Sequence, residues 1–283
     1  MMKRVLSIQD ISCFGKCSTT IALPVISAMG VETAILPTAV LSTHTMFKNF
    51  TCADLSDQIA PITQHWQDEG ITFDGIYTGY LGSFEQIEMV EKIFDTFAPD
   101  DKTLKFVDPV MADNGALYPA FDLDYAKRNA EFCGHADIIV PNITEACFMT
   151  DTPYKADMNE AEVKALLEKL GKLGARIAVL TGVSLSDGMT GFMGLDTQTG
   201  EFLSHQNPRI DASYHGTGDL FASACVGGIL NGLPWDQAMA IASDYTAETI
   251  AVTLKDPKKP WYGVNFETTL PSLIAKLTVA KNI

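Results

Sequence analysis

The sequence predicts an α/β fold in which a mostly parallel sheet carries helices on both faces and a small antiparallel hairpin at one edge. Short apolar runs with β-branched residues alternate along the chain with segments of helical periodicity. Alternation on this scale is typical of a parallel sheet covered by helices. Near residue 190 it gives way to two strand-like runs joined by a glycine-containing turn, which indicates an antiparallel hairpin.

The individual elements follow from these patterns in chain order. Buried strands are predicted for the β-branched apolar runs: Val5 to Ile8, Val31 to Leu36, Gly75 to Tyr80, Leu104 to Val107, Asp137 to Val140 and Ile177 to Thr181. Helices are predicted for the periodic segments between them: Ser18 to Met29, Leu55 to Glu69, Ser83 to Phe97, Tyr125 to Cys133 and Asn159 to Leu173. Pro24 predicts a kink in the first helix or a weaker helix there. The hairpin and the last helices complete the chain: Gly188 to Leu195 with Glu201 to Ser204, then Ala222 to Leu230, Pro234 to Val252 and Thr268 to Leu277.

Composition restricts the class of protein. The chain has 283 residues, of which 47% are apolar and 19% charged, and no linker or repeat divides it, so a single domain over residues 1–283 is expected. No uninterrupted apolar stretch is long enough to span a membrane, and the run Val5 to Ile8 is too short for a signal peptide. The six cysteines form no CxxC pair and no zinc spacing, which favours reduced, mostly buried thiols in a cytoplasmic protein.

The net charge of −15 argues against nucleic acid as a partner, because such binding needs clustered lysine and arginine. Acidity does not prevent binding of a nucleotide, since a divalent cation can bridge carboxylates and phosphates. An acidic chain that uses ATP is therefore expected to need Mg²⁺.

The motif Gly216-Thr217-Gly218-Asp219 is the most informative feature of the chain. Two glycines let the backbone turn with its N–H groups exposed, and the helix that follows adds a positive dipole end. Such a turn suits anionic oxygens, and Asp219 adds a carboxylate that could take a proton from a substrate hydroxyl. Taken alone, the motif is more typical of a plain turn with aspartate as a helix cap.

Three strand ends carry groups that suit phosphate or a metal ion. Asp108 and Asp113 follow one strand, where they could bind Mg²⁺, although an aspartate before proline is also a common turn residue. Asn142 and Glu145 follow the next strand, with a spacing that also forms a helix capping pattern. Thr181 precedes a glycine at the end of a third strand and could contact phosphate.

Together these motifs resemble the ribokinase-like superfamily and, within it, the pyridoxal kinases of vitamin B6 salvage. The resemblance covers nearly the whole chain and is carried by six segments: Ser7-Ile8-Gln9, Ser42-Thr43-His44-Thr45, Tyr77-Thr78-Gly79-Tyr80, Asp108-Pro109-Val110-Met111, Pro141-Asn142-Ile143-Thr144-Glu145 and Gly216-Thr217-Gly218-Asp219. It implies a three-layer sandwich and transfer of the γ-phosphoryl group of ATP to the 5′-hydroxymethyl group of a B6 vitamer. It also implies a homodimer.

The resemblance assigns a role to each matching residue. Asp219 matches the catalytic base, and the three residues before it match an anion hole around the transferred phosphoryl group: Gly216, Thr217 and Gly218. A second set matches positions that hold the nucleotide phosphates, the Mg²⁺ ion and its water: Asp108, Asp113, Asn142, Glu145 and Thr181. Within that set, Asp108 and Glu145 match the metal positions, and Asp113 also lies near an activating monovalent cation, K⁺ or Na⁺.

Three residues match the substrate side: Asp10, Thr45 and Tyr80. Many pyridoxal kinases carry serine at the position of Asp10. A carboxylate prefers a cationic ligand edge, so Asp10 suggests a tilt toward pyridoxamine or a pyrimidine alcohol. Lys16 lies in a nearby loop, where a solvated lysine is the default expectation.

Two alternatives remain open. One is hydroxymethylpyrimidine kinase chemistry, although that branch typically begins with a Gly-rich segment and carries cysteine in the anion-hole turn. This chain instead begins Ser7-Ile8-Gln9-Asp10 and has Tyr214-His215 before the turn. The other alternative is a non-catalytic vitamer-binding protein, for which loss of Asp219 or of its neighbouring glycines would have been evidence.

Overall fold

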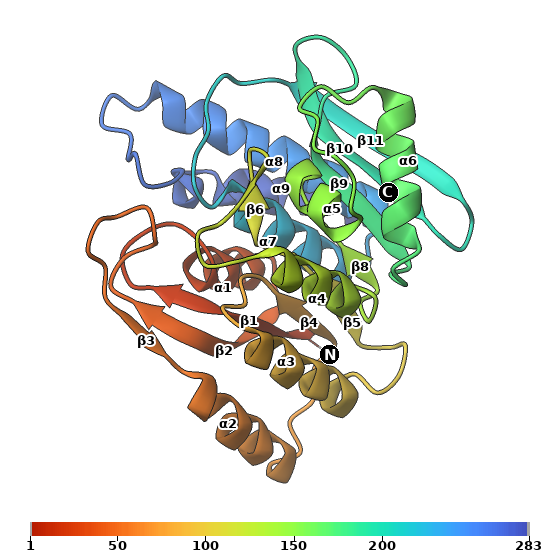
Figure 1. The fold of residues 1–283 in the computed structure, drawn as a ribbon. Helices are drawn as coiled ribbons and strands as arrows, with labels where there is room; N and C mark the ends of the chain where they lie inside the picture. Colours follow the sequence, from red (N-terminus) through yellow and green to blue (C-terminus); the bar gives the residue numbers. More distant parts are fainter. Residues whose placement is uncertain (1, 282–283) are drawn as a thin grey trace. The chain divides into compact units, whose positions relative to one another are not determined.

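A computed structural model describes residues 2–281 of the chain, which form two compact units (Figure 1). The first unit joins the N-terminal segment Met1–Tyr77 to the C-terminal segment Ile210–Ile283, and the second is Thr78–Arg209. The expectation of a single domain over residues 1–283, whose outermost residues lie outside the described range, stays a prediction.

The first unit contains the two longest parallel strands, β1 (Arg4–Ser12) and β2 (Glu32–Leu41), with the short antiparallel β3 (Cys52–Asp54) beyond β2. The strand β4 (Gly75–Thr78) runs to the boundary of the unit. The helices of this unit are α1 (Thr19–Ala28), α2 (Ser56–Asp68), α7 (Thr217–Leu230), α8 (Trp235–Lys255), the short 3₁₀ helix η1 (Phe266–Thr268) and α9 (Leu270–Lys281).

The core of the first unit forms where α1 and α7 pack together beside β1. Leu6 and Ile8 of β1 and Ile21 of α1 are completely buried, as is Leu220 of α7. The helix α7 is apolar around most of its circumference, which is the pattern of a buried helix rather than of an amphipathic surface helix. A buried helix fixes the position of its first turn.

The second unit contains the parallel strands β5 (Leu104–Val107), β8 (Ile138–Ile139) and β9 (Ile177–Val183). The antiparallel strands β10 (Met189–Asp196) and β11 (Glu201–Pro208) extend this sheet, and β6 (Ala112–Asp113) pairs with β7 (Ala116–Leu117) in a separate ribbon. Its helices are α3 (Phe84–Phe97), α4 (Leu123–Cys133), α5 (Ile143–Met149) and α6 (Glu160–Gly171). Parallel strands with helices and an antiparallel hairpin at the edge confirm the predicted fold class.

The predicted helices and strands are present, and the differences have local causes. The helix α7 begins at Thr217, five residues before the predicted start at Ala222, because Gly216 in a left-handed conformation serves as its N-cap. As a result Asp219 lies inside the first helical turn and not in a preceding loop. The helix α1 continues through Pro24 over the predicted segment.

Four of the six cysteines are buried and none forms a disulfide, as the sequence predicted: Cys17, Cys133, Cys147 and Cys225. Within residues 2–281, no helix combines the length and the apolar character that crossing a membrane requires.

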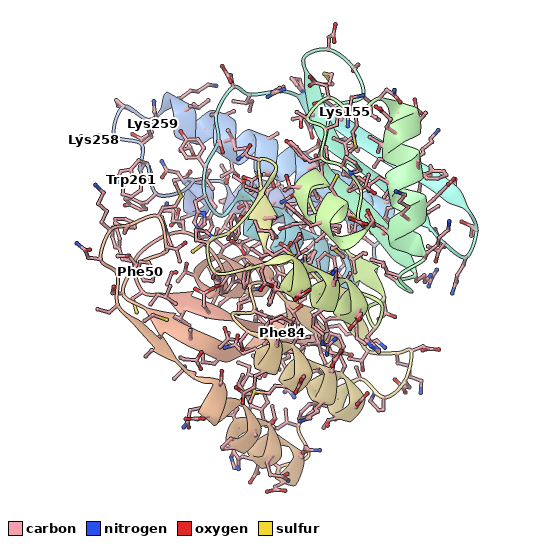
Figure 2. The ribbon with its side chains drawn as sticks, viewed as in Figure 1. Phe50, Phe84, Lys155, Lys258, Lys259 and Trp261 are labelled. Carbon is pink, nitrogen blue, oxygen red and sulfur yellow. The ribbon has the colours of Figure 1, made fainter. Side chains whose placement is uncertain are left out.

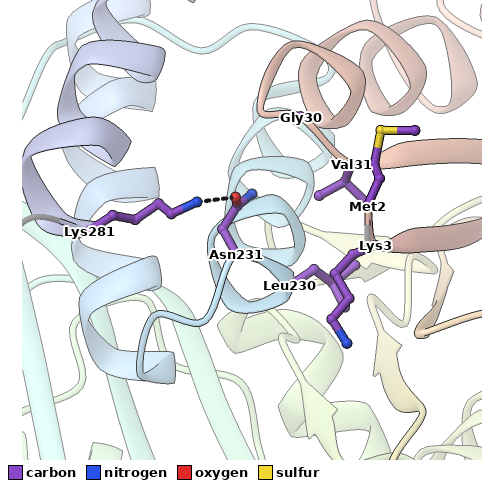
Figure 3. Close-up of a pocket in the computed structure, with 7 residues that line it drawn as sticks. All are labelled: Met2, Lys3, Gly30, Val31, Leu230, Asn231 and Lys281. Atoms are coloured by element: carbon purple, nitrogen blue, oxygen red, sulfur yellow. Dashed lines mark hydrogen bonds between the residues drawn. The ribbon is translucent and has the colours of Figure 1, made fainter.

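A hollow of about 330 Å³ lies in the first unit beside the N-terminal end of β1 (Figure 3). Met2, Lys3, Asn231 and Lys281 help to line it, and Lys281 donates a hydrogen bond of 2.9 Å to Asn231. Met2 and Lys3 precede the first residue of β1, whereas Asp10 lies near its last residue. Because a strand rises roughly 3.3 Å per residue, the hollow and Asp10 are at opposite ends of β1. It is therefore distinct from the candidate site.

Candidate active site

The predicted anion hole is the N-terminus of helix α7. Gly216 has φ +82°, and a Cβ atom there would lie 1.9 Å from the carbonyl oxygen of Lys16, so no other residue fits without movement of the backbone. Thr217 begins the helix, and its hydroxyl donates to the carbonyl of Tyr214 at 3.1 Å. The first N–H groups of a helix have no partner within it, and together with the helix dipole they favour an anion. The first turn of α7 therefore provides the electrostatics that a phosphoryl group needs.

Asp219 lies in that same first turn and is half-buried. The pKa of its carboxyl group is raised to about 7: burial is the main cause, the backbone N–H of Ser18 lowers the pKa by hydrogen bonding, and the nearby carboxylate of Asp10 raises it. A group with a pKa near 7 can accept a proton at neutral pH and release it again. The environment of Asp219 is thus that of a general base.

Asp10 is the second carboxyl group of this site. It lies near the end of β1 with 6% of its surface exposed and accepts a hydrogen bond from Ser12 at 3.2 Å. Burial raises its pKa, while the hydroxyls of Ser18 and Ser12 and the nearby His44 lower it. Among the described residues, no lysine or arginine contributes to the pKa shift of Asp10 or Asp219. This pair of carboxyl groups would therefore interact favourably with a cationic ligand edge.

Two histidines lie beside these groups, and sequence reasoning left both outside the site. The rings of His44 and His215 are 4.5 Å apart, although 170 residues separate them in the chain. His44 accepts from the N–H of Met46 through Nδ1 at 3.3 Å, so Nε2 carries the proton and donates to the carbonyl of Tyr262 at 3.1 Å. Burial lowers both pKa values, that of His215 to about 4, so both rings are neutral near pH 7. No spacing in the sequence could have indicated this pair.

Aromatic side chains extend the histidine pair toward solvent. The ring of Phe47 lies 4.8 Å from that of His44 and 4.5 Å from that of Trp261. Trp261 is 58% exposed, and Figure 2 shows it at the surface near Lys258 and Lys259. Thr45, predicted to contact the substrate, is exposed in the turn that carries His44. In this turn, His44 is buried and anchors the backbone, whereas Thr45 is exposed and can face a ligand.

In the second unit, Glu145 and Asn142 form the capping box that their spacing allowed. The side chain of Asn142 accepts from the N–H of Glu145 at 3.0 Å, and Glu145 accepts from the N–H of Asn142 at 2.8 Å. Glu145 also accepts from the N–H of Met111 at 3.1 Å and from that of Ala112, and Asn142 donates to the carbonyl of Ala112 at 2.8 Å. These bonds hold the turn after β5 against the start of α5.

This turn carries the predicted metal and nucleotide residues of the second unit. Asp108 is 7% exposed, and its N–H donates to the carbonyl of Thr78 at 2.9 Å. The pKa of Glu145 is raised to about 8: burial is the main cause, backbone hydrogen bonds lower the pKa, and the charge of Asp113 raises it. Burial raises the pKa of the Cys133 thiol, and the charges of Glu145 and Asp108 raise it too. The charges of Asp108, Asp113 and Glu145 thus act within one group of neighbouring residues.

Thr181 joins this group through the sheet. Its N–H donates to the carbonyl of Pro141 at 3.0 Å, and Thr181 pairs with Asn142 as an isolated parallel bridge. Tyr80 lies apart from the group, after β4, where its half-buried ring is 5.4 Å from that of Phe121. The predicted residues thus form two sets: one in the first unit around Asp219, and one in the second unit around Glu145.

The residues of the second set suit a cation that takes most of its ligands from phosphate and water. Mg²⁺ is usually bound in this way, through one or two carboxylates plus substrate phosphates. Among residues 2–281, no three acidic, histidine or cysteine side chains converge as a cage for a metal ion. Because Glu145 already accepts hydrogen bonds from backbone N–H groups through both oxygens, it could contact such a cation through a water molecule.

A family model described as phosphomethylpyrimidine kinase matches residues 22–260, which is most of the chain. The chain belongs to this kinase family. Its relatives include the pyridoxal kinase of Dictyostelium discoideum, 26% identical over 80% of this chain and 78% of the relative. The pyridoxine/pyridoxal/pyridoxamine kinase of Bordetella avium is 28% identical over 88% of this chain and 85% of the relative.

Solved structures agree with this assignment. A Bacteroides thetaiotaomicron protein crystallised with pyridoxal is 34% identical, with a TM-score of 0.91 and coverage of 96% of both chains. The pyridoxal kinase of Lactobacillus plantarum is 30% identical, with a TM-score of 0.88 and coverage of 97% of this chain and 98% of that one. The resemblance to pyridoxal kinases of the ribokinase-like superfamily is thereby confirmed.

Proposed function

We propose that this kinase transfers the γ-phosphoryl group of ATP to the 5′-hydroxymethyl group of a B6 vitamer: pyridoxal, pyridoxamine or pyridoxine. The observation that carries the proposal is Asp219, a half-buried carboxyl group in the first turn of α7 whose pKa is raised to about 7. The names of the relatives supply the substrate class, because kinases from several organisms that resemble this chain over most of its length act on pyridoxal.

The reaction follows from the environment of Asp219. Its carboxylate accepts the proton of the substrate hydroxyl, and the hydroxyl oxygen forms a bond to the γ-phosphorus while the bond from that phosphorus to the bridging oxygen breaks. ADP leaves with the electron pair of the broken bond. The N–H groups at the start of α7, with Gly216, Thr217 and Gly218, stabilise the negative charge on the transferred group. Positioning and charge stabilisation thus account for the chemistry.

The second unit supplies the nucleotide side of the proposal. Asp108 would hold Mg²⁺ directly and Glu145 through water, with Asn142, Asp113 and Thr181 toward the phosphates. When bound, Mg²⁺ neutralises charge on the phosphate oxygens. Asp113 is exposed enough to take part in binding a monovalent cation, K⁺ or Na⁺.

The substrate side is assigned to Asp10, Thr45 and Tyr80. The buried Asp10 carboxyl group interacts with a protonated pyridine nitrogen or with the ammonium group of pyridoxamine more favourably than a serine would. Tyr80 offers an aromatic surface for the ring, and Thr45 offers a hydroxyl group for a ring substituent.

The proposal extends to the assembly and the place of action. We infer a homodimer in the cytoplasm, where ATP and free vitamers are available and the thiols stay reduced. The absence of basic clusters in a chain of net charge −15 supports small molecules as its ligands rather than nucleic acid.

The proposal is tested by ADP release in a coupled assay with MgATP and each of four alcohols: pyridoxal, pyridoxamine, pyridoxine and hydroxymethylpyrimidine. Turnover with the vitamers that Asp219→Asn abolishes supports the proposal. Turnover confined to hydroxymethylpyrimidine would instead support the alternative suggested by the family description. Absence of turnover with all four would indicate a binding protein.

A further inference from the structure

Lys16 lies in the loop between β1 and α1. The sequence suggested a solvated ammonium group, but in the structure this group has partners in the protein. The side chain is 16% exposed and lies 2.8 Å from the carboxylate of Glu267 and 3.3 Å from the side-chain oxygen of Asn265. It also lies over the ring of Phe266, 5.6 Å from its centroid. Lys16 therefore ties this loop to a segment about 250 residues later in the chain.

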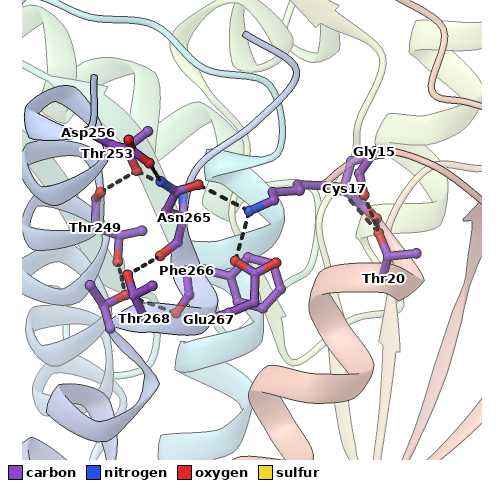
Figure 4. Close-up of polar contacts among 12 residues, drawn as sticks. Gly15, Cys17, Thr20, Thr249, Thr253, Asp256, Asn265, Phe266, Glu267 and Thr268 are labelled. Atoms are coloured by element: carbon purple, nitrogen blue, oxygen red, sulfur yellow. Dashed lines mark hydrogen bonds and ion pairs between the residues drawn. The ribbon is translucent and has the colours of Figure 1, made fainter. Parts of the chain in front are cut away.

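The segment that receives Lys16 is itself fixed to helix α8 (Figure 4). The N–H of Asn265 donates to the hydroxyl of Thr253 at 2.8 Å, and its side-chain amide donates to Asp256 at 2.9 Å. Thr253 is completely buried and donates in turn to the carbonyl of Thr249 at 2.7 Å. The partners of Lys16 thus form a rigid anchor.

The loop that Lys16 holds contacts the candidate base. The carbonyl oxygen of Lys16 packs against Gly216, the N-cap of α7, where a Cβ atom would approach it to 1.9 Å. Two residues later, the N–H of Ser18 donates a hydrogen bond to the carboxylate of Asp219. Ser18 has φ +48°, a left-handed conformation that a residue other than glycine keeps only when its surroundings impose it. A firm anchor for the loop is therefore needed if this hydrogen bond is to persist.

We propose that Lys16 is a positioning residue for Asp219. Held by Glu267 and Asn265, it keeps the N–H of Ser18 directed at the Asp219 carboxylate and the loop backbone against the start of α7. This role rests on the proposed function, because it matters only if Asp219 is the base of the reaction. Nothing in the motifs of the sequence indicates it, since Lys16 and Glu267 are joined only by the fold.

The role has a measurable consequence for the titration of Asp219. The titratable groups that act on Asp219 are Asp10 on β1 and, within the loop, Cys17, whose pKa burial raises to about 12 so that it stays a neutral thiol. Neither is removed when Lys16 is changed. The hydrogen bond from Ser18 lowers the pKa of Asp219. If the anchor is lost, this hydrogen bond is lost with it, and the pKa of Asp219 should rise.

The test compares wild type with Lys16→Met, Lys16→Arg and Glu267→Gln in pH profiles of kcat and KM. Lys16→Met should raise the apparent pKa of the acid limb by about one unit and so lower kcat at pH 7 by about fivefold, with little change in KM for MgATP. Lys16→Arg should restore most of the rate. Glu267→Gln keeps the lysine charge and removes a partner, so the proposal requires its acid limb to move in the same direction as that of Lys16→Met. If Glu267 acted only through the electric field of its negative charge, its removal would lower the pKa of Asp219, and the acid limb would move in the opposite direction.

A matched control is Lys276→Met, because Lys276 forms an ion pair of 3.3 Å with Glu248 between α8 and α9 of the same unit. It should leave the profile unchanged. An unchanged acid limb in Lys16→Met and Glu267→Gln, or an equal change in Lys276→Met, would overturn the proposal. Carboxyl ¹³C NMR titration of Asp219 in the unliganded protein gives the same comparison without turnover. If no alcohol is phosphorylated, the proposed function fails, and this titration still decides the role of Lys16.

Discussion

The raised pKa of Asp219 predicts that the carboxylate at this position lowers stability above neutral pH. The perturbation is Asp219→Asn, which keeps the shape of the side chain and removes its titration. In the folded protein the pKa is about 7, against 3.8 for the ordinary group. Between these two values the folded state binds more protons than the unfolded state, so the free energy of unfolding falls as the pH rises through this window.

The magnitude follows from the size of the shift. A shift of about three units, at about 1.4 kcal/mol per unit, corresponds to about 4 kcal/mol of destabilisation once the pH exceeds 7. At pH 5 only part of this cost is present, because Asp219 is protonated in the folded state. Relative to wild type, Asp219→Asn should therefore gain about 2 to 3 kcal/mol of stability between pH 5 and pH 8. The titrations of Asp10 and Glu145 contribute to both proteins and largely cancel in the difference.

The assay is urea unfolding followed by tryptophan fluorescence at pH 5 and pH 8. All three tryptophans lie in the first unit, the unit that holds Asp219: Trp66, Trp235 and Trp261. Fluorescence therefore reports the unfolding of the relevant unit. The same variant should lose at least about a hundredfold in kcat, since it lacks the base. If variant and wild type differ by the same free energy at both pH values, Asp219 has an ordinary pKa and the electrostatic argument fails.

Three further predictions test other contacts of the two units. Asp10→Ser should lower kcat/KM for pyridoxamine relative to pyridoxal by about tenfold, because a charge-assisted hydrogen bond is lost; an unchanged ratio would exclude Asp10 as a selectivity residue. Gly216→Ala should abolish turnover and lower the thermal midpoint of unfolding, because the added Cβ atom would overlap the backbone carbonyl of Lys16. The ADP assay measures turnover and calorimetry the midpoint, and wild-type values in both would contradict the prediction. Glu145→Gln should destabilise the protein by about 1 to 3 kcal/mol and raise KM for ATP. The reason is that Glu145 accepts hydrogen bonds from Asn142 and Met111 through two oxygens, whereas an amide has only one acceptor oxygen. Urea unfolding measures the stability and kinetics the KM, and an unchanged KM would exclude Glu145 from the nucleotide site.

The order of strands and helices was predictable because each element carries its own pattern. The strand β5 is a short run that is apolar except for Lys105, and its limits agree with those predicted. The short strand β3 was missed because its three residues are exposed and carry no alternation. The start of α7 was misplaced because two glycines there have low helix propensity, and the helix is extended by the N-cap at Gly216 and by tertiary packing.

The residues of the candidate site were predictable where a motif lies within a few positions, as in Gly216 to Asp219. Contacts between distant segments were not. The ring contact of His44 with His215 and the ion pair of Lys16 with Glu267 depend on which loops the fold brings together, and single lysines and histidines carry no signal of that kind. The wrong expectation for Lys16 has this cause, because a solvated lysine is the commonest outcome for a loop position.

The two carboxyl groups of the first unit connect substrate choice to the strength of the base. Burial and the charge of Asp10 raise the pKa of Asp219, and the N–H of Ser18 lowers it. A cationic group bound to Asp10 would offset the charge that this residue exerts, so the pKa of Asp219 would fall and more of the base would be ionised at pH 7. A neutral ligand would leave that charge in place. On the proposed function, the same carboxylate that would favour a cationic vitamer would therefore also prepare Asp219 to accept the proton from it.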